Sequence, residues 1–182
     1  MLLHVGTQTL KTNRLTLRRY TIDDAEMMYK NWAYDSRVTK YLTWEPHSSV
    51  NATRELLKIW CADYEKEDNY NWVIEYGGKI IGSISVVNQS QRDEFAEIGY
   101  CIGFDYWGKG IMTEAAKAVI DFLFKVGFNR ISIEHAVKNP GSGKVAEKCG
   151  MTLEGTKRQY FKSAGGEFLD INEYSILRSE WE

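Results

Sequence analysis

The segment over residues 99–115, GYCIGFDYWGKGIMTEA, constrains the fold more than any other part of the sequence. An apolar, strand-like run is followed by Gly108-Lys109-Gly110 and then by a helix-forming stretch that continues without a break to Gly127. Glycines let the backbone turn tightly, and the first N–H groups of a following helix lack intrahelical partners. A strand, a glycine turn and a helix in this order form a cradle for an anion, so we expect a phosphorylated ligand here.

Two common phosphate-binding motifs do not fit this segment. Gly103, Gly108 and Lys109 match most of a nucleotide-triphosphatase P-loop, but Gly110 stands where the magnesium-binding Ser or Thr is required. The dinucleotide-binding fingerprint fails at Thr113, which takes the place of its third glycine. A glycine turn that binds no ligand remains the alternative interpretation of the spacing alone.

The chain as a whole has the size and composition of one folded unit. Its 182 residues, 43% of them hydrophobic, are enough to bury the core of a single domain over residues 1–182. Charges nearly balance, with 23 basic and 25 acidic residues, so we expect neither nucleic acid nor a membrane as a partner. No apolar stretch is long enough to span a bilayer and no signal peptide is evident, which predicts a cytoplasmic protein.

The cysteines and histidines form no metal-binding pattern, and we predict no metal. They are scattered singly, without the paired spacing of zinc ligands or of a disulfide framework, at Cys61, Cys101, Cys149, His4, His47 and His135. An unpaired intracellular cysteine is usually a small buried hydrophobe, and Cys149, the candidate for a reactive thiol, is interpreted in that way.

The pattern of apolar residues predicts a mixed sheet flanked by helices. Alternation and β-rich runs indicate about seven strands, over residues 14–18, 72–76, 79–87, 95–104, 130–137, 152–162 and 168–177. Helical spacing indicates helices over 22–34, 50–64, 113–125 and 140–148, the last capped by Asn139 with Pro140 in its first position. Glycine turns predict antiparallel hairpins, whereas the strand–helix–strand unit around Gly108 must be right-handed and parallel. The fold class is therefore α/β (α+β), with a mostly antiparallel sheet.

Four stretches, taken in order, resemble one family. They lie at residues 12–18 (TNRLTLR), 96–100 (AEIGY), 106–115 (YWGKGIMTEA) and 139–150, and together they extend over nearly the whole chain. On these residues the chain resembles the GNAT superfamily of acyl-CoA-dependent N-acetyltransferases, and most of all its RimJ/RimL type, named for acetylation of ribosomal-protein N-termini. One departure is Asp105, where the family's loop commonly begins with Arg or Gln. The resemblance implies the GNAT fold, with a sheet of about seven strands splayed at the cofactor site.

Acetyl-CoA is the cofactor that the resemblance implies, and it explains why no metal ligand is needed. In the family, the pyrophosphate lies on backbone N–H groups of the glycine turn, at the positive end of the following helix. In this chain these residues are Trp107, Gly108, Lys109, Gly110, Ile111, Met112 and Thr113. The pantetheine arm is expected to pair with the strand at Tyr100, Cys101 and Ile102, with Asn139 holding the arm and Ser142 beside its sulfur. Backbone N–H groups near Cys101 and Ile102 then polarise the thioester carbonyl.

Two residues are the catalytic candidates. Glu97 lies on the strand that should line the cleft, and its carboxylate is expected to accept the ammonium proton of the acceptor, directly or through water. The alternative is a solvated or salt-bridged strand residue. Ser142 matches a serine of RimJ/RimL-like enzymes and is expected to protonate or hydrogen-bond the leaving thiolate, since Ala146 stands where many relatives carry a tyrosine. Its alternative role is helix capping.

The acceptor is expected to be a primary amine, with a protein N-terminal α-amine as the first choice. The pKa of such an amine, about 8 against about 10.4 for lysine, makes it easier to deprotonate. Glu97 and two residues in regions that wall the family's acceptor cleft, Trp44 and Tyr160, are the predicted substrate contacts. The open alternatives are a small amine such as a polyamine or an aminoglycoside, a non-catalytic acyl-CoA-binding regulator, and a nucleotide-triphosphate hydrolase. A homodimer is also left open.

Overall fold

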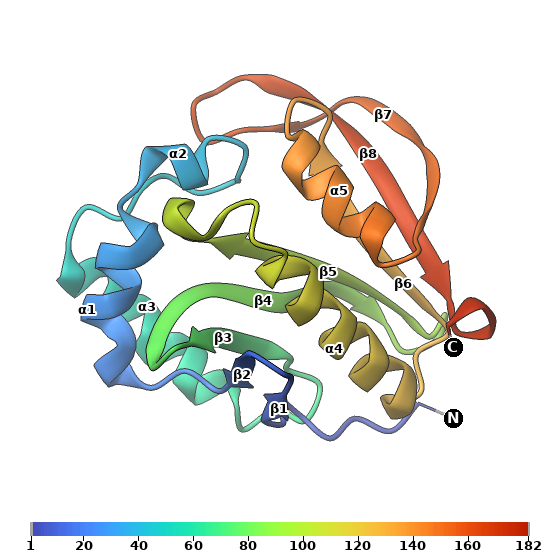
Figure 1. Ribbon diagram of the computed structural model, residues 1–182, viewed down its shortest axis with the longest axis horizontal. Helices are drawn as coiled ribbons and strands as arrows, with labels where there is room; N and C mark the ends of the chain where they lie inside the picture. Colours follow the sequence, from blue (N-terminus) through green and yellow to red (C-terminus); the bar gives the residue numbers. More distant parts are fainter. Residues whose placement is uncertain (1, 182) are drawn as a thin grey trace.

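The computed structural model describes residues 2–181, which form one continuous sheet of eight strands in the order β1-β2-β3-β4-β5-β6-β8-β7 (Figure 1). The strands are β1 (Leu10–Lys11), β2 (Leu15–Arg18), β3 (Asn71–Tyr76), β4 (Lys79–Ser90), β5 (Phe95–Ile102), β6 (Arg130–Ala136), β7 (Thr152–Lys162) and β8 (Phe168–Leu177). Only β5 and β6 pair in parallel. The predicted mixed, mostly antiparallel α/β sheet is confirmed. The predicted count of about seven strands is one short, because β1 is two residues long and shows no alternating pattern.

Helices cover both faces of this sheet. α4 (Ile111–Val126) and α5 (Pro140–Lys148) pack on one face, in front of the sheet in Figure 1. The other face is covered by α1 (Ala25–Met28), α2 (Ser36–Thr39) and α3 (Val50–Asp63). Each face therefore has its own apolar core against the shared sheet. No helix within the described residues is long and apolar enough to cross a membrane.

The predicted helix over residues 22–34 is divided into three short pieces. A 3-10 turn (Ile22–Asp24) leads into α1, and a π-helical turn (Tyr29–Ala33) follows. Because the π-helical turn is wider than an α-helical turn, Trp32 and Ala33 face the sheet on the same side as Met28. All three residues are buried. α2, which is also four residues long and which the apolar pattern does not predict, comes next along the chain. Packing against the sheet, more than helical periodicity, therefore determines the local geometry of this segment.

A continuous apolar stripe positions α4. Ile111, Ala115, Val119 and Leu123 recur every four residues, and each is at most 1% exposed. Burial of an Ile, Val or Leu side chain of this kind contributes about 1.5–3 kcal/mol. This packing holds the first turn of α4, and with it the glycine turn, near the end of β5.

β5 and β6 pair over only part of their length. Their parallel register covers Phe95↔Arg130, Ala96↔Ile131 and Glu97↔Ser132, whereas β5 continues to Ile102 and β6 to Ala136. Figure 1 shows the two strands meeting at one end and diverging toward α5. β6 stays paired with β8 over its whole length, so the divergence leaves one edge of β5 open.

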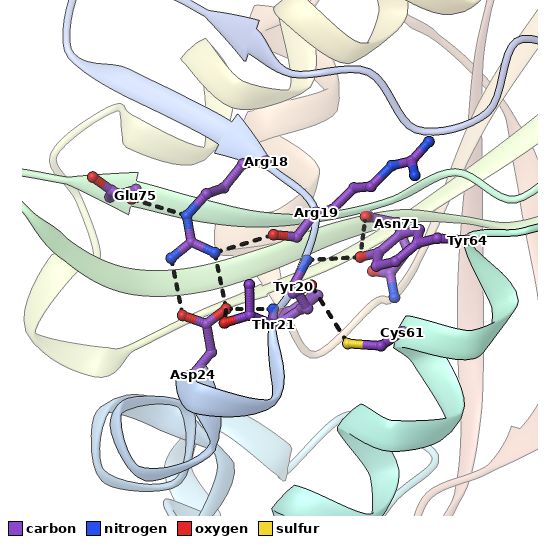
Figure 2. A network of polar contacts seen from close by, with 9 residues as sticks. All are labelled: Arg18, Arg19, Tyr20, Thr21, Asp24, Cys61, Tyr64, Asn71 and Glu75. Carbon is purple, nitrogen blue, oxygen red and sulfur yellow. Dashed lines mark hydrogen bonds and ion pairs between the residues drawn. The ribbon is translucent and has the colours of Figure 1, made fainter.

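Arg18 ties the N-terminal part of the sheet to the 3-10 turn (Figure 2). Its guanidinium donates to both carboxylate oxygens of Asp24, at 2.8 and 2.9 Å, and to Glu75 on β3 at 3.0 Å. Burial raises the pKa of the Asp24 carboxyl, but hydrogen bonds from Arg18 and Thr21 outweigh this and lower it. The ion pair therefore keeps Asp24 charged and joins three elements.

Candidate active site

A cleft of about 560 Å³ opens where β5 and β6 separate. Its walls come from the end of β5, the glycine turn with the start of α4, the start of α5, and the segment after α2. The predicted cofactor residues that line it are Tyr100, Cys101, Ile102, Trp107, Gly108, Gly110, Ile111, Met112, Thr113, Asn139 and Ser142. Lys109 does not line it, and its ammonium lies 5.4 Å from the ring centroid of Tyr106.

The glycine turn presents backbone N–H groups to this cleft. Gly108 and Gly110 have φ angles of +73° and +71°, a backbone conformation that residues other than glycine rarely adopt. Gly110 begins α4 without a side-chain cap, and the first intrahelical bond runs from Glu114 N–H to the Gly110 carbonyl at 3.1 Å. The preceding N–H groups therefore have no intrahelical acceptor, and they carry the positive end of the helix dipole. An anion such as a diphosphate fits this cradle.

The end of β5 offers a free strand edge to the same cleft. On one side Tyr100, Cys101 and Ile102 pair with β4, down to the register pair Gly82↔Ile102. On the side facing β6, pairing stops at Glu97. An extended ligand can therefore pair with the backbone here as an added strand.

Tyr100 and Ser142 meet on one wall of the cleft. The Tyr100 hydroxyl lies 2.8 Å from Ser142 Oγ and 3.2 Å from the Ser142 carbonyl. The Ser142 hydroxyl thus contacts a side chain and not a free helix N–H. Asn139 occupies the N-cap position of α5, but its side chain makes no capping bond, so the prediction that Asn139 caps this helix is wrong in that respect. Asn139 and Ser142, which are predicted to contact the pantetheine arm and its sulfur, both line the cleft.

Glu97 lies at the last paired position of β5, beside the point where the strands separate. It does not line the cleft, and alternation places its side chain on the face opposite the buried Ala96 and Ile98. Burial raises the pKa of the Glu97 carboxyl, and the negative charge of Glu134 raises it further, while Lys157 acts in the opposite direction. The carboxylate is therefore more basic than an exposed glutamate.

The comparison with protein families decides the identity of the fold. Residues 14–152 match the family described as an acetyltransferase (GNAT) domain. The chain belongs to the GNAT acetyltransferase family. The resemblance found in the sequence is confirmed, and the cleft between β5 and β6 is the candidate site of this acetyltransferase.

Two relatives and one solved structure are similar to this acetyltransferase. YdaF of Bacillus subtilis (strain 168), whose name proposes a ribosomal N-acetyltransferase without establishing one, is 34% identical over 96% of this chain and 97% of YdaF. The ribosomal-protein-serine acetyltransferase of Escherichia coli (strain K12) is 34% identical over 54% of this chain and 55% of that protein. The crystal structure of the microcin C7 self-immunity acetyltransferase MccE in complex with acetyl-CoA and AMP has a TM-score of 0.82 at 26% identity, covering 91% of this chain and 93% of MccE. The chain is thus an acetyl-CoA-dependent N-acetyltransferase.

The structure places the predicted acceptor contacts of this acetyltransferase outside the cleft lining. Trp44 is half-buried against the core formed by α1 and α3, with its ring 5.4 Å from that of His47. Tyr160 is 58% exposed on β7. From the same loop as Trp44, Tyr41 and Leu42 do line the cleft. Tyr41 and Leu42, and not the predicted Trp44, are therefore the residues by which this loop lines the cleft.

The sequence did not lead us to predict the basic residues that line the cleft. Lys138, Lys144 and Lys148 line it, from the end of β6 and from α5 of the acetyltransferase. Lys144 and Lys148 stand one helical turn apart, and that spacing is the signal that was available in the sequence. Ammonium groups here suit the phosphates of a CoA donor.

Cys101 also lines the cleft of the acetyltransferase, so its reactivity bears on the chemistry. Burial raises the pKa of its thiol to about 12, which keeps the thiol protonated at neutral pH and makes it a weak nucleophile. Among residues 2–181, no three His, Cys, Asp or Glu side chains gather as a metal-binding group. Of the predicted site residues, Glu97 and Ser142 carry side-chain groups that can transfer a proton, and the Tyr100 hydroxyl contacts Ser142.

Proposed function

We propose that this enzyme transfers the acetyl group of acetyl-CoA directly to a protein N-terminal α-amine in the cytoplasm. The observation that carries the proposal is the split between β5 and β6, which has a free strand edge, an anion cradle at one end and a basic carboxylate at the other. These three features match the three needs of the reaction: hold a thioester, bind its diphosphate and deprotonate an amine.

Donor binding is assigned to backbone groups. The N–H groups at the start of α4 would bind the diphosphate, with Lys144 and Lys148 adding positive charge. The free edge at Tyr100 to Ile102 would pair with the pantetheine arm, which carries amides of its own. A backbone N–H on this edge would then donate to the thioester oxygen as negative charge develops on it. The protonated thiol of Cys101 favours direct transfer over an acetyl-cysteine intermediate.

Proton transfer is assigned to side chains on either side of the split. Glu97, whose carboxyl pKa is raised by burial and by Glu134, would take the ammonium proton of the acceptor, through water because it stands outside the cleft lining. Ser142 would donate a hydrogen bond to the departing thiolate sulfur, or pass it a proton that the serine regains from the nitrogen of the tetrahedral adduct as the C–S bond breaks. Tyr100 supports this role when its one hydroxyl proton goes to Ser142 Oγ, the nearer acceptor at 2.8 Å, and not to the Ser142 carbonyl at 3.2 Å, because the serine proton is then free to point into the cleft.

The α-amine is the preferred acceptor on chemical grounds. Its pKa of about 8 lies closer to that of a moderately basic carboxylate than the value of about 10.4 for a lysine side chain. The Escherichia coli relative, named as a ribosomal-protein-serine acetyltransferase, supports a ribosomal protein as the acceptor. An acceptor peptide would enter past the loop that carries Tyr41 and Leu42, where Leu42 accepts a hydrogen bond from Ala164 in the β7–β8 turn.

The test is release of free thiol from acetyl-CoA in the presence of matched acceptors. One peptide is offered with a free N-terminus and no lysine, and a second with a blocked N-terminus and one lysine. A polyamine and an aminoglycoside complete the series. We expect turnover with the first peptide only. Faster turnover with the polyamine or the aminoglycoside would replace the proposed acceptor by a small amine, and tight donor binding with no turnover on any acceptor would favour a regulator.

A further inference from the structure

The segment that connects β1 to β2 reaches the cofactor turn through Arg14. Arg14 Nε donates to Glu114 Oε2 at 2.6 Å, and one of its terminal nitrogens donates to the carbonyl of Lys109 at 3.2 Å. The backbone N–H of Arg14 and the hydroxyl of Thr12 both donate to the other Glu114 oxygen, at 3.0 and 2.6 Å. Residues about 100 positions apart thus meet at the first turn of α4.

The contact with Lys109 determines how the next peptide group is oriented. In a planar trans peptide, the C=O of one residue and the N–H of the next point in opposite directions. Because the Lys109 carbonyl points to Arg14, the N–H of Gly110 points away from Arg14. Gly110 lines the cleft and Arg14 does not, so this N–H is directed to the side of the diphosphate cradle.

The negative charge of Glu114 at the start of α4 also has to be neutralised before an anion can bind there. Glu114 places a carboxylate in the first turn of α4, next to the place where an anion would bind. Alone it would repel a diphosphate, because like charges at close range disfavour each other. Arg14 pairs with it, and the pair is partly shielded, with the Glu114 side chain 21% exposed. A single arginine therefore neutralises the carboxylate and holds the turn.

We propose that Arg14 and Glu114 form a clamp that positions the Gly110 N–H for the diphosphate of the acetyl donor. Both are positioning residues and neither contacts the reacting atoms. The inference rests on the proposed placement of acetyl-CoA in the β5–β6 cleft. It accounts for the first arginine of the TNRLTLR stretch, whereas the second, Arg18, pairs with Asp24 and Glu75, and none of these three lines the cleft.

The test compares two donors on the Arg14→Ala enzyme. Acetyl-CoA carries the diphosphate, and S-acetylpantetheine lacks it. We expect the Kd and the KM for acetyl-CoA to rise about tenfold, the effect of losing roughly one well-placed hydrogen bond. The kcat at saturating acetyl-CoA and the kcat/KM for S-acetylpantetheine should stay within about twofold of wild type. Glu114→Gln, which cannot accept from both Arg14 donors, should give part of the same loss, and adding it to Arg14→Ala should not deepen the loss, because it removes the carboxylate that is left unpaired.

Control variants separate this role from general stability. Asp121→Asn removes an exposed ion pair with Lys125 on the same helix, at 2.6 Å, and should change neither donor's kinetics. Arg18→Ala should lower the melting temperature more than Arg14→Ala does. Equal losses with both donors, or no loss with acetyl-CoA, would overturn the clamp. Wild-type enzyme that fails to bind acetyl-CoA at all would instead overturn the proposed function on which it rests.

Discussion

Glu97 shares its face of the sheet with several charged residues. Glu134, Lys157 and Glu173 act on it from β6, β7 and β8, and Asn88 lies opposite on β4. Lys157 is itself shared, because its ammonium pairs with both Glu134 and Glu173. The lysine charge is thus divided between two other carboxylates, so the charge of Glu97 is incompletely compensated. Burial is the largest cause of the raised pKa of the Glu97 carboxyl, and this incomplete compensation adds to it.

Replacing Glu97 by glutamine should slow the reaction and stabilise the fold. A carboxyl whose pKa is higher in the folded than in the unfolded chain destabilises the folded state above the folded pKa, and the effect disappears below the unfolded value of about 4.3. We expect Glu97→Gln to melt higher than wild type at pH 8 and equally at pH 3.5, as measured by circular dichroism. Its kcat should fall about 100-fold or more and lose the limb that rises with pH.

A control glutamate makes this prediction specific. Glu65 is exposed and lies after α3, and Glu65→Gln should change neither the melting temperature nor the pH–rate profile. A Glu97→Gln enzyme with a wild-type pH–rate profile would show that another group takes the proton. A lower melting temperature at pH 8 would mean that the carboxylate is compensated after all.

Tyr100→Phe should reduce turnover without weakening donor binding. The change removes the hydroxyl that lies 2.8 Å from Ser142 Oγ and leaves the backbone edge of β5 in place. We expect kcat to fall about tenfold, as for the loss of one hydrogen bond, with KM for acetyl-CoA within about twofold. Steady-state kinetics of Tyr100→Phe, Ser142→Ala and the double variant provide the measurement. If the two residues act together, the double variant is no slower than Ser142→Ala, and multiplied losses would argue against a pair.

At the scale of elements, the sequence was informative where structure depends on local signals. Turn residues predict the hairpins at Gly77-Gly78 and at residues 164–166, proline in the first helical position predicts the helix begun by Pro140, and the structure confirms all three elements. β1 was missed because two residues carry no periodicity, and its pairing comes from β2. The contacts of Arg14 with Glu114 and Lys109 could not be predicted from the sequence for a different reason. They depend on how α4 packs against the N-terminal strands, which no local pattern encodes.

Gly82→Ala should distort the open strand of the site. A Cβ built on Gly82 would lie 2.5 Å from the Cys101 carbonyl oxygen and 3.0 Å from Ile102 Cα. Both are backbone atoms, so β5 must shift. We expect a loss of about 1–3 kcal/mol in the free energy of unfolding, measured in urea, and a raised KM for acetyl-CoA. In Gly165→Ala the added atom meets only Ser163 Oγ at 3.9 Å, and this variant should behave as wild type. A wild-type KM for Gly82→Ala would show that donor binding does not depend on this strand.

At the scale of the whole molecule, one sheet is shared by two cores. One core holds α4 and α5, and the other holds α1 and α3, on opposite faces of the same strands. Neither core is complete without the sheet between them. This supports the proposal of a single domain, although the two helical layers are separate along the chain.

Unfolding should accordingly occur in one cooperative step. Trp72 is buried in one core and Trp32 in the other, so tryptophan fluorescence reports on both. We expect the urea transition followed by fluorescence to coincide with that followed by far-ultraviolet circular dichroism. Acetyl-CoA at 100 times its Kd should add about 2.7 kcal/mol to the free energy of unfolding. Two separate transitions, only one of them moved by the donor, would show that the faces unfold independently.

The cradle and the free edge of β5 are both made of main-chain groups, whereas the loop after α2 contributes Tyr41 and Leu42 to the lining of the same cleft. Main-chain N–H groups survive most substitutions, since every residue except proline supplies one. Mutations in this loop can therefore accumulate while donor use persists. On this basis, a protein of this design can acquire new amine substrates over evolutionary time without first losing its acetyl source.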